Sequence, residues 1–247
     1  MKNPESQSAE ESALSPSPAR LAWWGMAQGA VVLAAGLNLR FMTGIIGPAP
    51  MMQWHHMLSM LVFTPLSLTM AFFMLHELAR ARRGSWPVFA LFMLSSFWIA
   101  VAMGAHEPVN QLQIKMRLLG DLSPAGKTMT FLDEVLSHWA FFTGYIGLCL
   151  SWAWAQARNP VPDPVKPWMW AVFVLASATG AAGIIASLWG DPLNGIIRDL
   201  GIIAAVILAC EILRWRGGTR RSQPVTVSIQ LGNMLAFAVL LLHGLLK

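Results

Sequence analysis

The chain has 247 residues, of which 55% are hydrophobic and only 12% are charged. Soluble domains carry about 25% charged residues, so the composition excludes an ordinary water-soluble globular protein. The net charge of +5 does not indicate nucleic-acid binding, because the basic residues stand in short clusters beside apolar segments. That distribution favours insertion into a membrane. We expect a multi-pass protein of the plasma membrane, which in a bacterium is the inner membrane.

The first part of the chain differs from the rest. Residues 1–20 are rich in Ser, Glu and Pro, which is typical of a disordered segment, and we expect a cytoplasmic tail. They lack the charged start and early apolar core of a cleavable signal peptide, so the first apolar segment is expected to remain as an anchor. Residues 21–247 are predicted to form a single transmembrane helical domain.

Seven apolar segments follow the tail, and each is near or above the roughly 20 residues that cross a hydrocarbon core as a helix. They cover residues 21–39, 52–78, 86–105, 130–157, 168–189, 193–213 and 225–246. The sequence therefore predicts an all-α membrane bundle of about seven transmembrane helices.

Lys and Arg residues predict the orientation of this bundle. With a cytoplasmic N-terminus, eleven of them fall on the cytoplasmic side and five on the other side, while Arg198 lies within a segment. An excess of Lys and Arg marks the cytoplasmic side, so the N-terminus is predicted inside. The eleven are Lys2, Arg20, Arg80, Arg82, Arg83, Arg158, Lys166, Arg214, Arg216, Arg220 and Arg221.

The fifth segment carries a face of small residues over 176–186, which suits close helix packing. The face consists of Ala176, Ser177, Gly180, Gly183 and Ala186. Packing within the monomer is the commoner use of such a face, and a homo-oligomer formed through it is the alternative.

Polar residues gather on the predicted non-cytoplasmic side. An ionisable group inside a bilayer costs roughly 2.5–3.5 kcal/mol at the helix centre, and such groups usually face a protein interior or an aqueous cavity. Several helices that offer polar groups at one depth predict a pocket that opens outward. The residues are Asn38, Arg40, His55, His56, His106, Glu107, Asn110, Asp133, Glu134, His138, Asp191, Asn194, Arg198 and His243.

The connection over residues 106–130 links two halves of this predicted site. Thr130 and Asp133 have the spacing of a capping box, which predicts that the fourth helix begins at Thr130. Glu134 and His138 would then share one helix face. Pro108 suits the first turn of a helix, so residues 108–120 are predicted to form a short interfacial helix, a lid over His106 and Glu107.

Each of these residues also has a structural explanation. Asp133 and Glu134 would both stabilise the positive N-terminus of their helix, and His55 and His56 suit a headgroup boundary. Arg198 and Asp199 would form an internal ion pair. Taken singly, the structural explanation is preferred for every residue except the pairs Glu134–His138 and His106–Glu107.

The first functional hypothesis is a metal-dependent membrane enzyme that acts on a lipid-like substrate. Imidazole and carboxylate groups suit zinc or iron, although no HExxH pair is present. The expected metal ligands are His106, Glu107, Glu134 and His138, completed by His55 or His56. The expected catalytic residues are Asp133, Glu134 and His138. The expected substrate-binding residues are Arg40, Asn110, Asp191, Asn194 and Arg198.

Three other classes remain open. In a b-type cytochrome or quinone-reactive subunit, His56 and His138 would ligate haem b and Arg40 would meet a propionate. A proton-coupled transporter would use Asp191, Arg198 and Asp199, although the sequence has no inverted repeat. In an accessory assembly subunit, the polar face would bind a partner.

Overall fold

The structure, a computed structural model, describes residues 15–41, 46–49, 52–80, 86–118, 120, 123–162, 165–189 and 193–246. The long helices are α2 (Pro18–Phe41), α4 (Thr64–Leu78), α5 (Trp86–Leu118), α7 (Ser137–Arg158), α8 (Pro167–Leu188), α9 (Leu193–Gly217) and α10 (Pro224–Leu245). The shorter elements are β1 (Ile46–Ala49), β2 (Met52–Gln53), α3 (Trp54–Leu58), α6 (Pro124–Phe131), the π-helical turns η1 (Ser59–Phe63) and η2 (Leu132–Leu136), and the 3₁₀ turn η3 (Arg220–Ser222).

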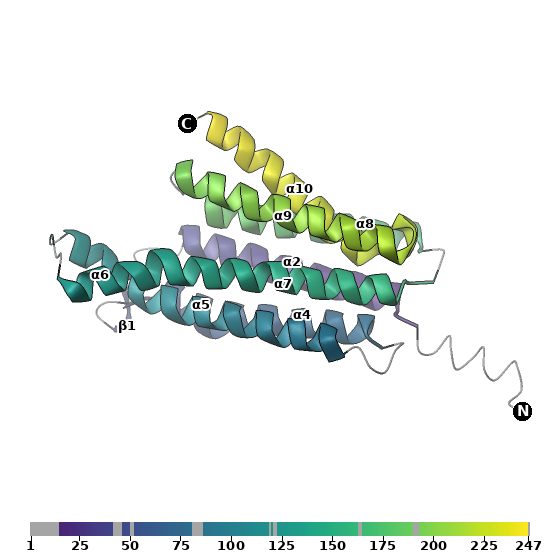
Figure 1. The fold of residues 1–247 in the computed structure, drawn as a ribbon, viewed down its shortest axis with the longest axis horizontal. Helices are drawn as coiled ribbons and strands as arrows, with labels where there is room; N and C mark the ends of the chain where they lie inside the picture. The colour runs from purple at the N-terminus through teal and green to yellow at the C-terminus, as the bar shows by residue number, and fades with distance from the viewer. Residues whose placement is uncertain are drawn as a thin grey trace, which may run out of the picture.

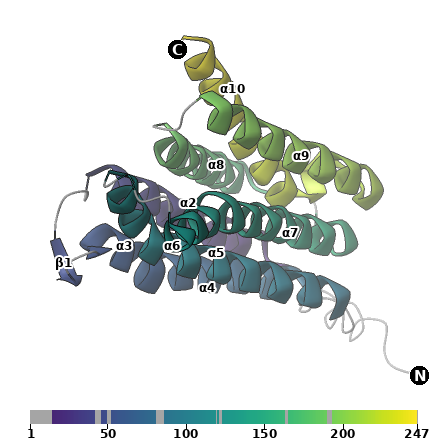
Figure 2. The same ribbon diagram turned by 60° about the vertical axis from the view of Figure 1, so that its left-hand side comes forward.

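Successive long helices run in opposite directions in a helical bundle (Figures 1 and 2). Helices α3, η1 and α4 follow one another without a break, as do α6, η2 and α7. Helices α6, α8 and α10 have Pro in their first turn, where the missing N–H group costs nothing. Pro65 of α4 instead follows directly on η1, so it lies inside a continuous helical run, which a membrane helix tolerates. Gly218 follows α9 with a φ of +113°, a conformation that glycine adopts readily where a helix stops.

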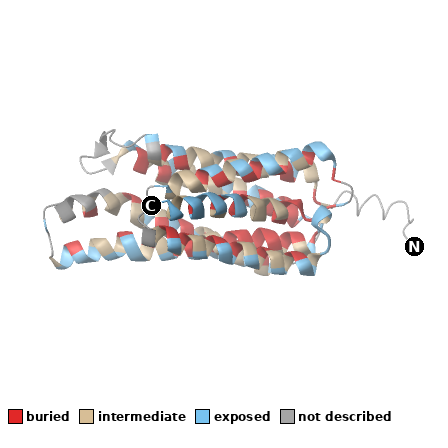
Figure 3. Ribbon diagram, turned by 90° about the horizontal axis from the view of Figure 1, so that it is seen from above, coloured by how far each residue is buried: buried red, intermediate tan, exposed pale blue. Residues whose placement is uncertain are grey.

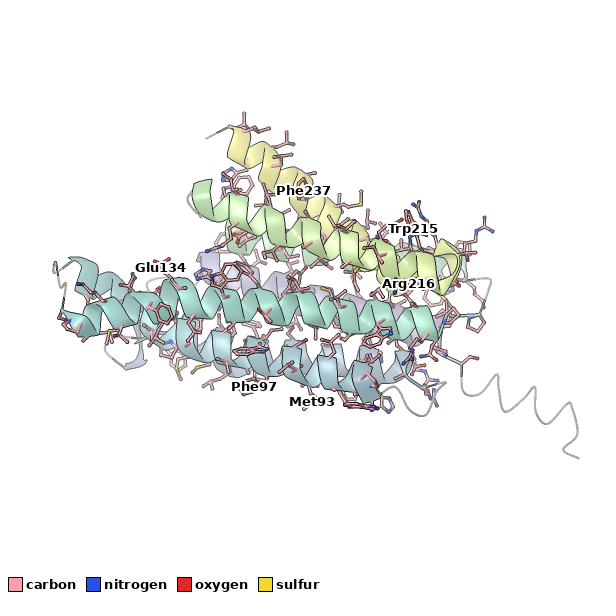
Figure 4. The ribbon with its side chains drawn as sticks, viewed as in Figure 1. Met93, Phe97, Glu134, Trp215, Arg216 and Phe237 are labelled. Atoms are coloured by element: carbon pink, nitrogen blue, oxygen red, sulfur yellow. The ribbon has the colours of Figure 1, made fainter. Side chains whose placement is uncertain are left out.

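Four of the described helical segments are long and apolar enough to cross a membrane: Trp54–Leu78, Trp86–Asn110, Pro167–Leu188 and Pro224–Leu245. Large apolar side chains also cover the outer surface of the bundle. Met93 and Phe97, labelled in Figure 4, are 62% and 59% exposed, and they point to the surroundings that a bilayer would fill. These findings agree with a membrane protein.

The two ends of the bundle differ in composition. We call the end where α2, α5, α8 and α10 begin the basic end, because it holds Arg residues. They are Arg20, Arg80, Arg158, Arg214, Arg216, Arg220 and Arg221. The opposite end, which we call the histidine end, holds His55, His56, His106, His138 and His243.

Close helix contacts hold the bundle together. A Cβ atom on Gly183 of α8 would lie 2.5 Å from the backbone of Val32 in α2, and one on Gly36 would lie 2.5 Å from the carbonyl oxygen of Gly183. The predicted small-residue face therefore packs within the chain, against α2, while a homo-oligomer stays a prediction. Buried residues follow the inward faces of the helices (Figure 3).

Polar pairs fix the basic end. The Glu77 carboxylate accepts a hydrogen bond from the Ser17 backbone N–H at 2.8 Å and lies 3.7 Å from Arg20 and 3.8 Å from Arg80. Glu211 pairs with Arg214 one turn further along α9. These contacts join α2 to α4 and stabilise the last turns of α9.

The connection over residues 106–130 differs from the prediction. Helix α5 continues to Leu118 with Pro108 inside it, so residues 108–118 extend a long helix and do not form a separate interfacial one. The next helix begins at Pro124, and the Ser123 hydroxyl caps it by accepting the Gly126 N–H. Thr130 lies within that helix, and its hydroxyl donates to the Gly126 carbonyl. The predicted start at Thr130 is corrected to Pro124.

The predicted disordered tail lies mostly outside the described residues, since the description begins at residue 15.

Candidate functional site

Three segments far apart in the sequence meet at the histidine end. They are the start of α3 with His55 and His56, the later part of α5 with His106 and Glu107, and the run from η2 into α7 with Asp133 and His138. Figures 1 and 2 place all three at the same end of the bundle. The sequence predicted this gathering, and the structure pairs the residues individually.

The first pair is His56 with Glu107. The His56 Nδ1 atom lies 2.6 Å from Glu107 Oε2, and the side chains are 4% and 2% exposed. The His55 ring contacts the His56 ring with 3.8 Å between centroids. His56 Nε2 is buried and has no hydrogen-bond partner among the described residues. Of the two adjacent histidines, His56 is therefore the one that meets the carboxylate.

Asn38 in α2 fixes the start of this helix. Its side-chain amide donates to the His55 carbonyl at 2.9 Å and to the Ser59 hydroxyl at 3.1 Å. Ser59 begins the π turn η1, and the Thr64 hydroxyl donates to the Ser59 carbonyl at 2.8 Å. These bonds connect α2 to the segment that carries the histidines.

The second pair is His106 with Asp133. The His106 Nδ1 atom lies 2.7 Å from Asp133 Oδ1, and the side chains are 32% and 3% exposed. A histidine whose Nδ1 meets a carboxylate keeps Nε2 for another partner. The His138 ring stands edge-on to the His106 ring, with 5.6 Å between centroids. The second pair is therefore more accessible than the first.

The π turn η2 decides which acid points inward. A π turn bonds residues five apart instead of four, so it shifts the helix faces by one residue. The His138 Nδ1–H donates to the Asp133 carbonyl, five residues earlier, at 3.1 Å. Asp133 is buried, whereas Glu134 is exposed. Asp133 thus contacts both His106 and His138, while the predicted Glu134–His138 pairing stays a prediction.

Other predicted residues have varied positions. Arg198 forms the expected ion pair with Asp199, Nε to Oδ1 at 3.0 Å, and its guanidinium lies 5.0 Å from the centre of the Phe142 ring. Asn110 is half-buried in α5, one turn beyond His106. Asp191 and the side chains of Arg40 and Asn194 lie outside the described residues.

The bundle contains a partly open cavity of about 390 Å³. Its walls are mainly apolar, with Ile99, Phe142 and Ile203 among them, and its polar lining at the histidine end includes His106, Glu107 and Asp199. Further in, it is lined by Gln28 of α2, Ser67 of α4, Tyr145 of α7 and Asn233 of α10. A concave apolar space with a few placed polar groups is the usual form of a small-molecule site.

The sequence did not predict the four polar residues deeper in this cavity. Their only signal was that each interrupts an apolar segment.

The predicted metal ligands do not gather around one point. Among the described residues, no group of three or more His, Cys, Asp or Glu side chains is placed to hold a metal ion. His106 and Glu107 are neighbours in α5, yet they contact different partners, Asp133 and His56. Glu134, expected as a shared ligand, is exposed at the histidine end (Figure 4). These residues form two separate pairs and do not fit a single coordination shell.

Neither the protein-family models, nor the curated proteins, nor the solved structures compared with the chain match it.

Proposed function

We propose that the chain crosses the membrane seven times, with the basic end in the cytoplasm and the histidine end on the far side. Two observations support this topology: the alternating direction of the long helices (Figure 1), and the Arg residues collected at one end. Lys and Arg favour the cytoplasmic side. The plasma membrane is the location that this topology implies.

Within that topology, the protein is an enzyme that binds a lipid-like molecule in the cavity and transfers a proton to or from its head group. One observation carries this proposal. His106 lines the cavity, and the same residue lies 2.7 Å from the buried carboxylate of Asp133. An apolar space for the body of an amphiphile thus ends at a histidine held by an acid.

The chemistry follows from the two pairs. His106 Nδ1 and Asp133 Oδ1 lie 2.7 Å apart without the alignment of a hydrogen bond, and the negative charge of Asp133 beside Nδ1 favours a proton there. Nε2 is then the atom that accepts a proton from the head group. Glu107, which also lines the cavity, is held by His56. The proton taken up on His106 Nε2 then returns from that atom to the product, so one imidazole acts first as base and then as acid, and the Glu107 carboxylate accepts a hydrogen bond from the head group. Positioned general acids and bases contribute about 10²–10⁴-fold to a rate.

The test uses the purified protein in nanodiscs with lipids from its host. Bound small molecules are extracted and identified by mass spectrometry, and a lipid extract is incubated with the protein to follow conversion. Wild type is expected to retain an apolar molecule and to convert a component of the extract. Asp133→Asn should slow the conversion by about 10²–10⁴-fold.

The control variant is His76→Gln, because His76 is exposed at the basic end and does not line the cavity. It should behave like wild type. A wild-type protein that retains no apolar molecule and converts none would refute the proposal, as would an Asp133→Asn variant with full activity.

The same preparation tests the cofactors expected from the sequence. Elemental analysis measures zinc and iron, and a visible absorption spectrum detects haem b. Acid–base chemistry by His106 and Asp133 needs neither, so a stoichiometric metal or a haem spectrum would replace it with the metal-dependent or cytochrome hypothesis.

A further inference from the structure

A second polar position lies deep in the cavity, away from the histidines. The Gln28 side chain of α2 donates from Nε2 to the Ser67 hydroxyl of α4 at 2.8 Å, and both residues line the cavity. Gln28 stands ten residues before Asn38 in α2, which corresponds to about 15 Å along the helix axis. Asn38 bonds the backbone of His55, so it marks the level of the histidine cluster.

Of the two polar atoms of the Gln28 amide, only Nε2 has a hydrogen-bond partner among the described residues. Its Oε1 atom is shielded from solvent and has no hydrogen-bond partner among the described residues. An unpaired polar atom in an apolar interior is unfavourable. Gln28 is therefore an acceptor that a bound molecule would satisfy.

Other polar groups that line the cavity differ from Gln28, because they bond to one another. The Tyr145 hydroxyl donates to Asn233 Oδ1 at 2.8 Å, and Asn233 Nδ2 donates to the Ile229 carbonyl at 2.9 Å. The Ser177 and Ser228 hydroxyls lie 2.8 Å apart. These bonds satisfy the polar groups of these residues. The Gln28 carbonyl, in contrast, is able to accept a hydrogen bond from a ligand.

We propose that the molecule bound in the cavity carries a hydroxyl or N–H group partway along its apolar body, and that this group donates to Gln28 Oε1. This inference rests on the proposed function, since it assumes that the head group lies at His106. It narrows the substrate class from lipid-like molecules in general to amphiphiles with a second polar group at about 15 Å from the first, by the rise of α2.

Two radiolabelled probes test the inference in nanodiscs. One is a long-chain fatty alcohol, and the other is the diol with a second hydroxyl at mid-chain. Wild type is expected to bind the diol about five- to tenfold more tightly, the gain that one net hydrogen bond provides. In Gln28→Met, which keeps the side-chain length and removes the acceptor, the diol should lose its advantage and bind no more tightly than the plain alcohol, because its second hydroxyl is then buried without a partner.

Gln230→Met is the matched control. Gln230 is a half-buried glutamine in α10 that bonds Glu211 and does not line the cavity, so the preference for the diol should persist. A size-exclusion profile and binding of the plain alcohol confirm that each variant is folded.

The outcomes separate this inference from the proposed function. Equal binding of both probes by wild type would overturn the inference alone, and would mean that water satisfies Gln28. A diol preference that survives in Gln28→Met would also overturn it. If wild type binds neither probe, the lipid site fails and the inference fails with it.

Discussion

Both ends of the bundle have carboxylates that pair with basic side chains, but the kind of basic side chain differs between the ends. At the basic end Glu77 and Glu211 pair with arginines. At the histidine end Glu107 and Asp133 pair with histidines. Arginine stays protonated at any physiological pH, whereas histidine exchanges its proton near neutral pH. Among these described pairings, the two with histidine contain a base whose ordinary pKa lies near neutrality.

The two ends of the bundle also differ in what they contribute to the lining of the cavity. His106 and Glu107 line it, whereas Glu77, Glu211 and Arg214 are not among its lining residues. Polar side chains at the basic end instead bond to the backbone between helices. Gln156 accepts the Thr226 N–H at 2.7 Å, and Gln223 donates to the Arg214 carbonyl at 3.0 Å. Polar groups at the basic end thus hold helices together, whereas the histidine end, besides such contacts of Asn38, has two ionisable residues, His106 and Glu107, that border the cavity.

The largest expected effect concerns which side of the membrane each end faces. Single cysteines at Glu134 and Arg216, both exposed and at opposite ends (Figure 4), would be treated with a membrane-impermeant maleimide on intact cells. Glu134→Cys should be labelled fully and Arg216→Cys only after permeabilisation. The native Cys149 and Cys210 are buried and serve as the unlabelled background. The opposite pattern would invert the proposed topology.

A stability comparison sharpens the difference between the acids. Glu107→Ala leaves His56 buried without its partner, and removing one member of a buried pair costs about 3–5 kcal/mol. Glu77→Ala should cost less, about 1–2 kcal/mol, because its partner Arg20 is 57% exposed and exposed pairs contribute little. Thermal unfolding in detergent measures both. Equal losses would show that the two ends are built with the same strength.

The smallest expected effect separates packing from binding. In Gly217→Ala at the basic end, the new Cβ would lie 2.5 Å from Ala157 Cα, and such overpacking costs about 1–3 kcal/mol. Gly201→Ala in the same helix meets no atom within 4 Å and should leave stability nearly unchanged. Both variants should retain the bound molecule at wild-type occupancy. Loss of that molecule in Gly217→Ala would connect the basic end to the cavity.

The apolar segments predicted where the long helices lie, because a span of about 20 apolar residues is a length requirement that sequence alone reveals. They did not predict where the helices end. Hydropathy stops at Ala105, but α5 continues through polar residues to Leu118. An apolar run ends where the surroundings change from lipid to water. An α-helix can continue across that boundary.

The details of the site depended on features that a sequence pattern does not record. Residues four apart share a helix face, so the sequence predicted Glu134 beside His138. The structure has a π turn, η2, at this point, and Asp133 is the acid that is buried. The cavity is formed by side chains from many helices, so no single segment contains its signature. The histidine end was predictable because its residues share one depth, whereas their pairing required the tertiary structure.

The length of helix α5 also determines how far the protein extends beyond the bilayer in the proposed topology. Its 33 residues make a rod of about 50 Å, while the hydrocarbon core is about 30 Å thick. With Trp86 near one boundary, about 20 Å of α5 would stand clear of the bilayer, joined there by α6. In the proposed topology these two helices would project into the aqueous phase, where a fusion partner or an antibody fragment could attach without touching the lipid-facing surface.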